Sequence, residues 1–134
     1  MQFLLDTNIC IHAIKGHPNV LAHLQVAGFD ACAISSVVLA ELSYGIAKSA
    51  SPHKDRNAVV LREFISLFQI LPWAAEAAWA HGPMRQCLAA AGTPIGEFDL
   101  LIAAQAVAAG LVVVTNNTRE FERIEGLKLE NWVD

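Results

Sequence analysis

The sequence has little charge for its length and no excess of positive charge. Charged residues make up 16% of the 134 residues, the formal net charge is -4, and hydrophobic residues make up 54%. This composition excludes a disordered chain and supplies enough apolar side chains for one hydrophobic core. It also gives no broad basic field for nucleic acid, so such a partner has to be held by a local patch or by metal ions.

Cysteines are also few, and their pattern excludes a zinc site and a paired redox motif. Three are present, widely spaced and without a CxxC pair: Cys10, Cys32 and Cys87. All three lie among apolar residues, so we expect buried, reduced thiols in a cytoplasmic protein. The five histidines show no metal-binding spacing, and we assign them no metal role.

Secretory and membrane-spanning segments are not expected either. No basic leader precedes the first apolar run at residues 3–5, although a signal peptide requires one. The longest apolar stretch, residues 100–114, is interrupted by Gln105 and Gly110, and this excludes a transmembrane helix there. The chain therefore has the composition of a globular enzyme or binding domain.

Short apolar runs alternate with segments of helical periodicity. We expect strands at 3–5, 31–34, 69–71, 111–114 and, at an edge, 127–132. Helices are expected at 9–14, 19–26, 36–46, 55–68, 74–91, 98–109 and 118–121. Gly82-Pro83 is expected to kink or divide the fifth of these helices. The pattern predicts one α/β domain, residues 1–134, with a parallel sheet of four to five strands between two helical layers.

Polar residues follow the predicted strands. Asp6 comes directly after the first strand, Asn116 and Asn117 come after the valine-rich strand, Glu41 lies about two turns into a helix, and Asp99 begins another. In a doubly wound sheet these residues all approach one edge. Carboxylates so close together repel one another, and a divalent cation is the usual compensation. Oxygen ligands favour Mg²⁺ or Mn²⁺.

Each of these residues also has an ordinary structural interpretation. Asp6 and Asp99 are typical helix N-caps when they are considered singly. A glutamate such as Glu41, considered alone, is usually on the solvated face of a helix. Its apolar neighbours, however, favour a carboxylate that faces inward. Glu120 and Glu122 are typical surface charges beside arginines, but Glu120 lies close enough to the asparagine pair to be a site candidate. Trp73 and Trp79 are interpreted as packing residues.

Four segments together resemble PIN-domain proteins, and within them the VapC toxins of bacterial toxin–antitoxin pairs. They are Leu4-Leu5-Asp6-Thr7-Asn8, Ile34-Ser35-Ser36-Val37-Val38-Leu39-Ala40-Glu41-Leu42, Phe98-Asp99-Leu100-Leu101-Ile102-Ala103 and Val114-Thr115-Asn116-Asn117-Thr118-Arg119-Glu120-Phe121. One such segment is a weak signal, whereas four in order in so short a chain are specific. The resemblance runs essentially from end to end.

The resemblance implies a three-layer α/β/α fold, a homodimer and an Mg²⁺- or Mn²⁺-dependent endoribonuclease. It implies that Asp6, Glu41 and Asp99 bind the metal, with Thr7, Asn8, Thr115 and Asn116 as supporting polar residues. Many PIN domains carry an aspartate where this chain has Asn117, and Glu120 is the candidate substitute for that acid. Asn117 and Glu120 both remain candidates for the fourth position. Glu97 stands where relatives often have proline, and the sequence does not explain it.

The resemblance also implies an RNA substrate and a protein partner. Family substrates are often structured RNA loops, so a tRNA anticodon loop is the preferred expectation and ribosomal RNA the second. A small VapB-type antitoxin is expected to wrap the toxin and block the acidic site, with an arginine that reaches the carboxylates. Arg119, Lys48 and Arg85 are the expected RNA-binding cations.

Three other functions share parts of this pattern. A DNA-directed nuclease would use the same acids, and a binding module that has lost its metal would keep the fold. Asn117 in place of aspartate favours the binding module, whereas retention of Asp6, Glu41 and Asp99 argues against it. A phosphoacceptor domain would need an acidic pair near the first strand and a lysine after the last core strand, and the sequence contains neither.

Overall fold

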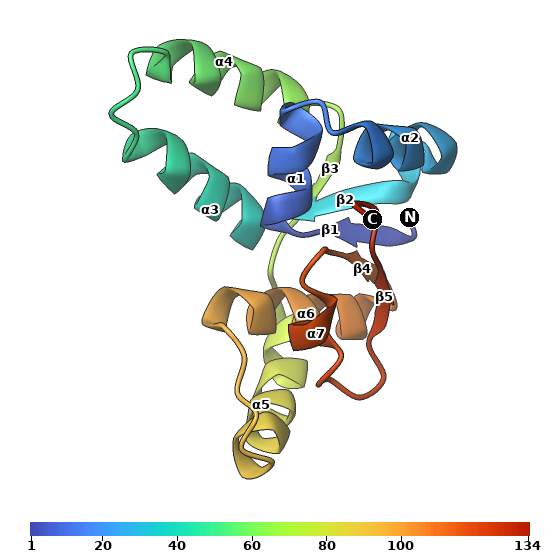
Figure 1. Ribbon diagram of the computed structural model, residues 1–134. Helices are drawn as coiled ribbons and strands as arrows, with labels where there is room; N and C mark the ends of the chain where they lie inside the picture. Colours follow the sequence, from blue (N-terminus) through green and yellow to red (C-terminus); the bar gives the residue numbers. More distant parts are fainter.

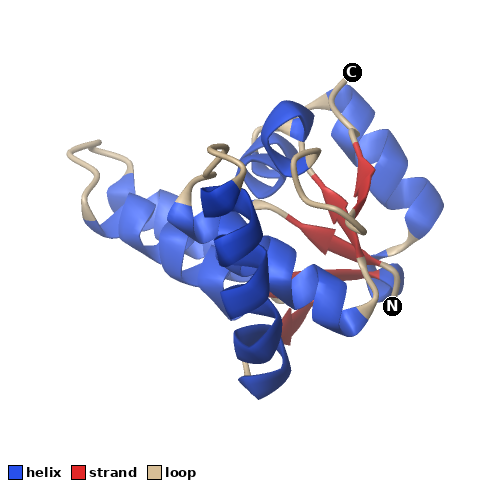
Figure 2. Ribbon diagram, turned by 90° about the horizontal axis from the view of Figure 1, so that it is seen from below, coloured by secondary structure: helices blue, strands red, loops and turns tan.

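A computed structural model describes all residues 1–134, and it is an α/β domain with helices on both sides of a sheet (Figure 1, Figure 2). Five strands form the sheet: β1 (Phe3–Leu5), β2 (Cys32–Ser35), β3 (Gln69–Leu71), β4 (Val112–Val114) and β5 (Lys128–Glu130). The predicted fold class is confirmed. The second strand begins one residue later than expected, because Phe29–Ala31 forms a 3₁₀ turn before it.

The five strands are all parallel, in the order β3-β2-β1-β4-β5. Leu5 is opposite both Ile34 and Val114, so the carboxyl ends of β1, β2 and β4 lie at the same edge. The chain winds outward from β1 to β3, then returns to the other side of β1 for β4 and β5. Ligand sites in such sheets lie at this reversal of strand order.

Seven helices accompany the sheet: α1 (Thr7–Ile14), α2 (Pro18–Ala27), α3 (Ser36–Ala47), α4 (Lys54–Ile65), α5 (Ala75–Ala90), α6 (Glu97–Ala109) and α7 (Thr118–Phe121). The first four gather on one side of the sheet, and α5 and α6 lie on the other (Figure 1). Gly82-Pro83 does not divide α5, because one helix runs through Pro83; the alternative, a kink at this point, stays a prediction. Both residues are exposed, so water can solvate the carbonyl that loses its partner.

The core lies between the sheet and its helices. All three residues of β1 are buried, and α6 is buried around most of its circumference, from Leu100 to Ala106. This explains why α6 is apolar almost throughout instead of amphipathic. Two side chains anchor the segment after β3 to this helix: the indole of Trp73 donates to the carbonyl of Leu101 (2.9 Å), and the amide of Gln105 donates to the carbonyl of Leu71 (3.2 Å).

Two expectations about buried residues are wrong. Cys10 and Cys32 are buried, but Cys87 is exposed on α5. Burial raises the pKa of the Cys10 thiol, and it raises that of Cys32 to about 11. Trp79 is 83% exposed and packs into no core; an alanine-rich helix with small neighbours gives little indication of which face is covered. None of the helices is both long enough and apolar enough to cross a membrane.

Candidate active site

Asp6 begins the site at the carboxyl end of β1. Its backbone N–H donates to the carbonyl of Val114 (3.1 Å), which continues the pairing of β1 with β4. Its side chain caps α1 by accepting from the N–H of Ile9 (2.9 Å). Asp6 is only 4% exposed, and this burial raises its pKa; bonds from Thr115 and Ile9 act in the opposite direction, and the charge of Glu41 adds to the rise.

Glu41 reaches the same place from α3. This helix begins where β2 ends, with the hydroxyl of Ser35 accepting from the N–H of Val37 (3.0 Å) as its cap. Glu41 lies in the second turn, and its Oε1 accepts a 2.7 Å hydrogen bond from the hydroxyl of Thr7. The side chain is half-buried. The prediction that Thr7 supports the acids is therefore consistent with this contact.

Asp99 lies in the first turn of α6, and Glu120 faces it from α7. Burial, together with the charges of Glu120, Asp6 and Glu41, raises the pKa of Asp99 to about 7. The two carboxyl groups share a hydrogen bond, which places the proton on Asp99. Asp99 is thus in electrostatic range of three other acids: Asp6, Glu41 and Glu120.

Glu120 is held by the predicted site residue Asn117 and by Gly96, which the sequence analysis did not assign. Its Oε1 accepts from the backbone N–H of Gly96, and its Oε2 accepts from Nδ2 of Asn117 (2.6 Å). Burial acts to raise the pKa of Glu120, but these two bonds, the bond to Asp99 and the charge of Arg123 together lower it. Arg123 stands three residues after Glu120, in the turn that follows α7. Nothing in the sequence indicates Gly96.

The other predicted residues fall into two groups. Thr115 is fully buried beside Asp6, and its hydroxyl also accepts from the N–H of Asn117 (2.9 Å). Asn8 and Asn116 are exposed, and no hydrogen bond joins them to the acids. Their supporting role stays a prediction.

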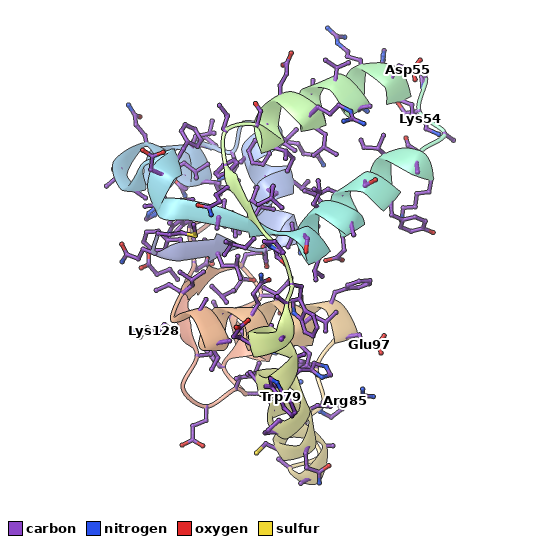
Figure 3. All side chains as sticks on the ribbon, turned by 180° about the vertical axis from the view of Figure 1, so that it is seen from behind. Lys54, Asp55, Trp79, Arg85, Glu97 and Lys128 are labelled. Atoms are coloured by element: carbon purple, nitrogen blue, oxygen red, sulfur yellow. The ribbon has the colours of Figure 1, made fainter.

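The three predicted RNA-binding cations, Lys48, Arg85 and Arg119, are all exposed. Lys48 follows the end of α3, and its ammonium lies 5.2 Å from the ring centre of Tyr44. Arg85 lies on α5 together with Trp79 (Figure 3). Since α3 and α5 extend in different directions, Lys48 and Arg85 do not form one basic patch within a single chain. Glu97, at the start of α6 (Figure 3), is an exposed first-turn acid, which the helix dipole favours.

The donor set fits a divalent cation chemically. It consists of carboxylate oxygens. Burial and the charge of Glu41 raise the pKa of both Asp6 and Asp99, His12 opposes the shift only at Asp6, and no lysine or arginine contributes to either shift. Repulsion of this kind is what a hard cation with oxygen ligands relieves. No three acidic, histidine or cysteine side chains lie close enough together to enclose one ion as they stand. The ligand assignment of Asp6, Glu41 and Asp99 therefore stays a prediction.

Two apolar cavities adjoin along α3 and α4, and the smaller one reaches the acids at Glu41. One, of about 370 Å³, is lined by Thr7 and Glu41 and by apolar residues of α1, α3 and α4 such as Ile11 and Val60. The other, of about 640 Å³, lies between α3 and α4. Both cavities include Ile46 and Leu61 in their walls. An apolar groove therefore runs along the α3–α4 pair and ends at Glu41.

Comparison with known proteins assigns the chain to a family. The PIN domain model matches residues 3–127. The chain belongs to the PIN-domain family. This PIN domain is 45% identical over 132 residues to the tRNA(fMet)-specific endonuclease VapC of Salmonella typhimurium, with 98% of each chain covered. It is 44% identical to Ribonuclease VapC2 of Rickettsia felis, again with 98% of each chain covered. The PIN domain is thus a nuclease of the VapC group.

Solved structures agree with this assignment. The PIN domain matches a chain in the structure of DNA-bound VapBC from Salmonella typhimurium with a TM-score of 0.91 and 44% identity, with 98% of each chain covered. It matches a chain in VapBC2 from Rickettsia felis bound to a promoter DNA fragment with a TM-score of 0.90 and 41% identity, covering 98% of this chain and 99% of the other. The sequence-based assignment to the PIN-domain family and the VapC group is confirmed.

Proposed function

We propose that this PIN domain is an Mg²⁺- or Mn²⁺-dependent endoribonuclease toxin that cleaves structured RNA and is neutralised by a VapB-type antitoxin. The observation that carries the proposal is the convergence of Asp6, Glu41 and Asp99. Burial raises the pKa of Asp6 and of Asp99, the charge of Glu41 adds to both shifts, and the opposing charge of His12 offsets only part of the rise at Asp6. Such an arrangement costs stability unless a cation is bound. The proposed site of action is the cytoplasm, as a homodimer.

The reaction is hydrolysis of a phosphodiester bond. A bound divalent ion supplies a more acidic water and offsets negative charge on the phosphate oxygens. Asp6, directly after β1, and Asp99, in α6, would hold the ion together with Glu41. Thr7 fixes one oxygen of Glu41, and Thr115 fixes Asp6, so that both carboxylates keep their orientation. Water displaces the 3′ oxygen, so the products carry 5′ phosphate and 3′ hydroxyl groups.

The proposed substrate is a tRNA, with the anticodon loop as the preferred cleavage region and ribosomal RNA as the second candidate. The Salmonella relative named for tRNA(fMet) supports this choice, because it is 45% identical over nearly the whole chain. The formal net charge of -4 makes broad electrostatic capture of RNA weak. Recognition of the RNA therefore depends on local contacts from Lys48, Arg85 and Arg119. It also depends on the RNA phosphate that the bound ion would hold at the acidic site.

The proposed antitoxin contact is the apolar groove along α3 and α4. Solved complexes of relatives with VapB-type partners support such a partner. An antitoxin segment that fills the cavity lined by Thr7 and Glu41 would lie directly beside the acidic site. One partner can therefore cover the groove and also block the access of RNA to the acids. A partner arginine placed there would pair with the acids in place of the cation.

Brief expression in bacteria, followed by 5′-end mapping of cellular RNA, tests the proposed function. Wild-type protein is expected to produce new 5′ phosphate ends in one RNA loop, whereas Asp6→Asn produces none. The purified proteins are then incubated with labelled RNA and DNA of the same sequence in Mg²⁺ or Mn²⁺. Cleavage of DNA alone would assign the site to a DNA-directed nuclease, and cleavage of neither by folded protein would contradict the proposal.

A further inference from the structure

Glu120 is anchored through both of its carboxylate oxygens, although it lies on a helix of only four residues. Each of its carboxylate oxygens has its own donor: Oε1 accepts from the N–H of Gly96, and Oε2 accepts from Nδ2 of Asn117. Asn117 is itself fixed, because its N–H donates to the hydroxyl of the buried Thr115 (2.9 Å). A short helix at the surface therefore presents a carboxylate in one fixed orientation.

The contact with Gly96 connects Glu120 to the helix that carries Asp99. Gly96 is the N-cap of α6, and it has no side chain with which to cap the helix. An added Cβ at Gly96 would lie 3.4 Å from Oε1 of Glu120 and 3.7 Å from Oδ2 of Asp99. Both acids thus lie close to the face of Gly96 on which a side chain would project. Movement of the loop before α6 would separate them.

Arg123 holds that loop. Its Nη1 donates to the carbonyl of Pro94 (3.1 Å), two residues before Gly96, and its positive charge acts on Glu120. The guanidinium therefore links the segment after α7 to the loop before α6. Asn117 and Arg123 both support the contact between Glu120 and Gly96. Asn117 binds the carboxylate of Glu120, and Arg123 binds the loop that carries Gly96.

We propose that Asn117 and Arg123 are positioning residues of this site, which hold Glu120 against Gly96 so that it serves as the fourth acid beside Asp99. The inference rests on the proposed metal-dependent function, which it deepens. In this arrangement the amide of Asn117 is a hydrogen-bond donor to an acid, so an aspartate at position 117 would repel Glu120 and would not replace Asn117 in this role.

The test measures Mn²⁺ binding by the intact protein without RNA, from the electron paramagnetic resonance signal of free Mn²⁺. Asn117→Ala and Arg123→Gln are each expected to weaken binding about tenfold, in the range found when residues that support metal ligands are removed. Arg123→Lys keeps the charge and one donor, and is expected to recover part of the loss. Lys128→Gln removes one positive charge from exposed β5 and is expected to leave binding unchanged.

A double-mutant cycle distinguishes positioning from a general structural effect. If Asn117 acts through Glu120, Asn117→Ala has no further effect on Mn²⁺ binding in a Glu120→Gln background. An undiminished tenfold effect in that background would overturn the proposal, as would wild-type binding by Asn117→Ala and Arg123→Gln. If Arg123→Gln does not fold, the Asn117 cycle decides alone.

RNA cleavage by the wild-type protein separates this inference from the proposed function. Cleavage together with an additive cycle would overturn only the positioning role. Mn²⁺ binding with the expected cycle, but without cleavage of RNA, would overturn the proposed function and leave the positioning role supported. Wild-type protein that binds no Mn²⁺ would contradict the positioning role, because no fourth acid is then needed.

Discussion

The hydroxyl of Thr7 donates a 2.7 Å hydrogen bond to Oε1 of Glu41, which joins the first turn of α1 to the second turn of α3. Thr7 directly follows Asp6, so this single contact fixes the distance between two of the acids at the carboxyl edge of the sheet. One oxygen of Glu41 is committed to the hydroxyl, and this bond holds its carboxylate toward Asp6.

Thr7→Val tests the value of that contact. Valine keeps the shape of threonine but has no hydroxyl, so Glu41 loses its orienting donor. We expect RNA cleavage and Mn²⁺ affinity to fall about tenfold, in the range for residues that support metal ligands, while the fold is retained. Thr7→Ser keeps the hydroxyl and is the matched control, with activity close to wild type. Equal activity in Thr7→Val and wild type would show that Glu41 needs no such donor.

The raised pKa of Asp99 predicts how the metal-free protein responds to pH. Folded protein keeps the proton on Asp99 up to about pH 7, whereas an unfolded chain releases it near the usual aspartate pKa of 3.8. Between these values the folded state binds more protons, so the free energy of unfolding decreases as the pH rises from about 4 to about 7. Urea unfolding at pH 5 and pH 7.5 in a chelator measures this decrease.

Two variants of the same experiment isolate the cause. Asp99→Asn cannot titrate, so the free energy of unfolding of this variant is expected to vary less between pH 5 and pH 7.5. Addition of Mn²⁺ at pH 7.5 is expected to restore stability to the wild-type protein, because a ligand that binds only the folded state stabilises it. Stability of the metal-free wild type that increases over this pH range would contradict the assignment.

The two tryptophans Trp132 and Trp79 are expected to differ sharply in their contribution to stability. Trp132 is 1% exposed; its ring centre lies 5.1 Å from that of Phe3, and its indole N–H donates to Glu130 (2.9 Å). Trp132→Ala should lower the free energy of unfolding by about 3–5 kcal/mol. Trp79→Ala, at a position that is 83% exposed, should change it by less than about 0.5 kcal/mol. Thermal or urea unfolding of both variants checks this.

Val60 and Val59 form a matched pair for the proposed antitoxin groove. Both lie on α4 and are exposed, but only Val60 lines the cavity beside Glu41. A buried charge without a partner is costly, so Val60→Glu should weaken antitoxin binding at least tenfold, whereas Val59→Glu should not. Both variants should retain RNA cleavage. Calorimetry with the purified antitoxin measures the affinity, and equal loss in both variants would place the contact elsewhere.

Most of the fold could be predicted because local patterns determine it. Uniformly apolar runs such as Val112–Val114 indicate strands covered on both faces. The position of Asp6, directly after β1, was enough to predict both that it caps a helix and that it belongs to the site. Errors arose where the pattern is ambiguous: the alanine-rich α5 does not reveal that Trp79 and Cys87 face outward, and exposure lets Pro83 lie inside the helix.

The acids of the site were predicted singly, whereas their contacts were not. Glu120 remained one of two candidates for the fourth position, because its distance from Asp99 depends on how α7 packs against the start of α6. Gly96 contributes its backbone N–H, and Arg123 binds the carbonyl of a loop residue. No sequence pattern indicates either contact. Local sequence therefore indicates which acids lie near the sheet edge, and tertiary packing decides which groups hold them.

A crystal structure of the protein soaked in Mn²⁺ tests the central claim most directly, because the anomalous signal locates the ion. The account predicts one strong peak bonded to carboxylate oxygens of Asp6, Glu41 and Asp99, with the Asp99 side chain released from its hydrogen bond to Glu120. No peak there at saturating Mn²⁺, or an ion bound by other residues while the three carboxylates keep their metal-free positions, would contradict it.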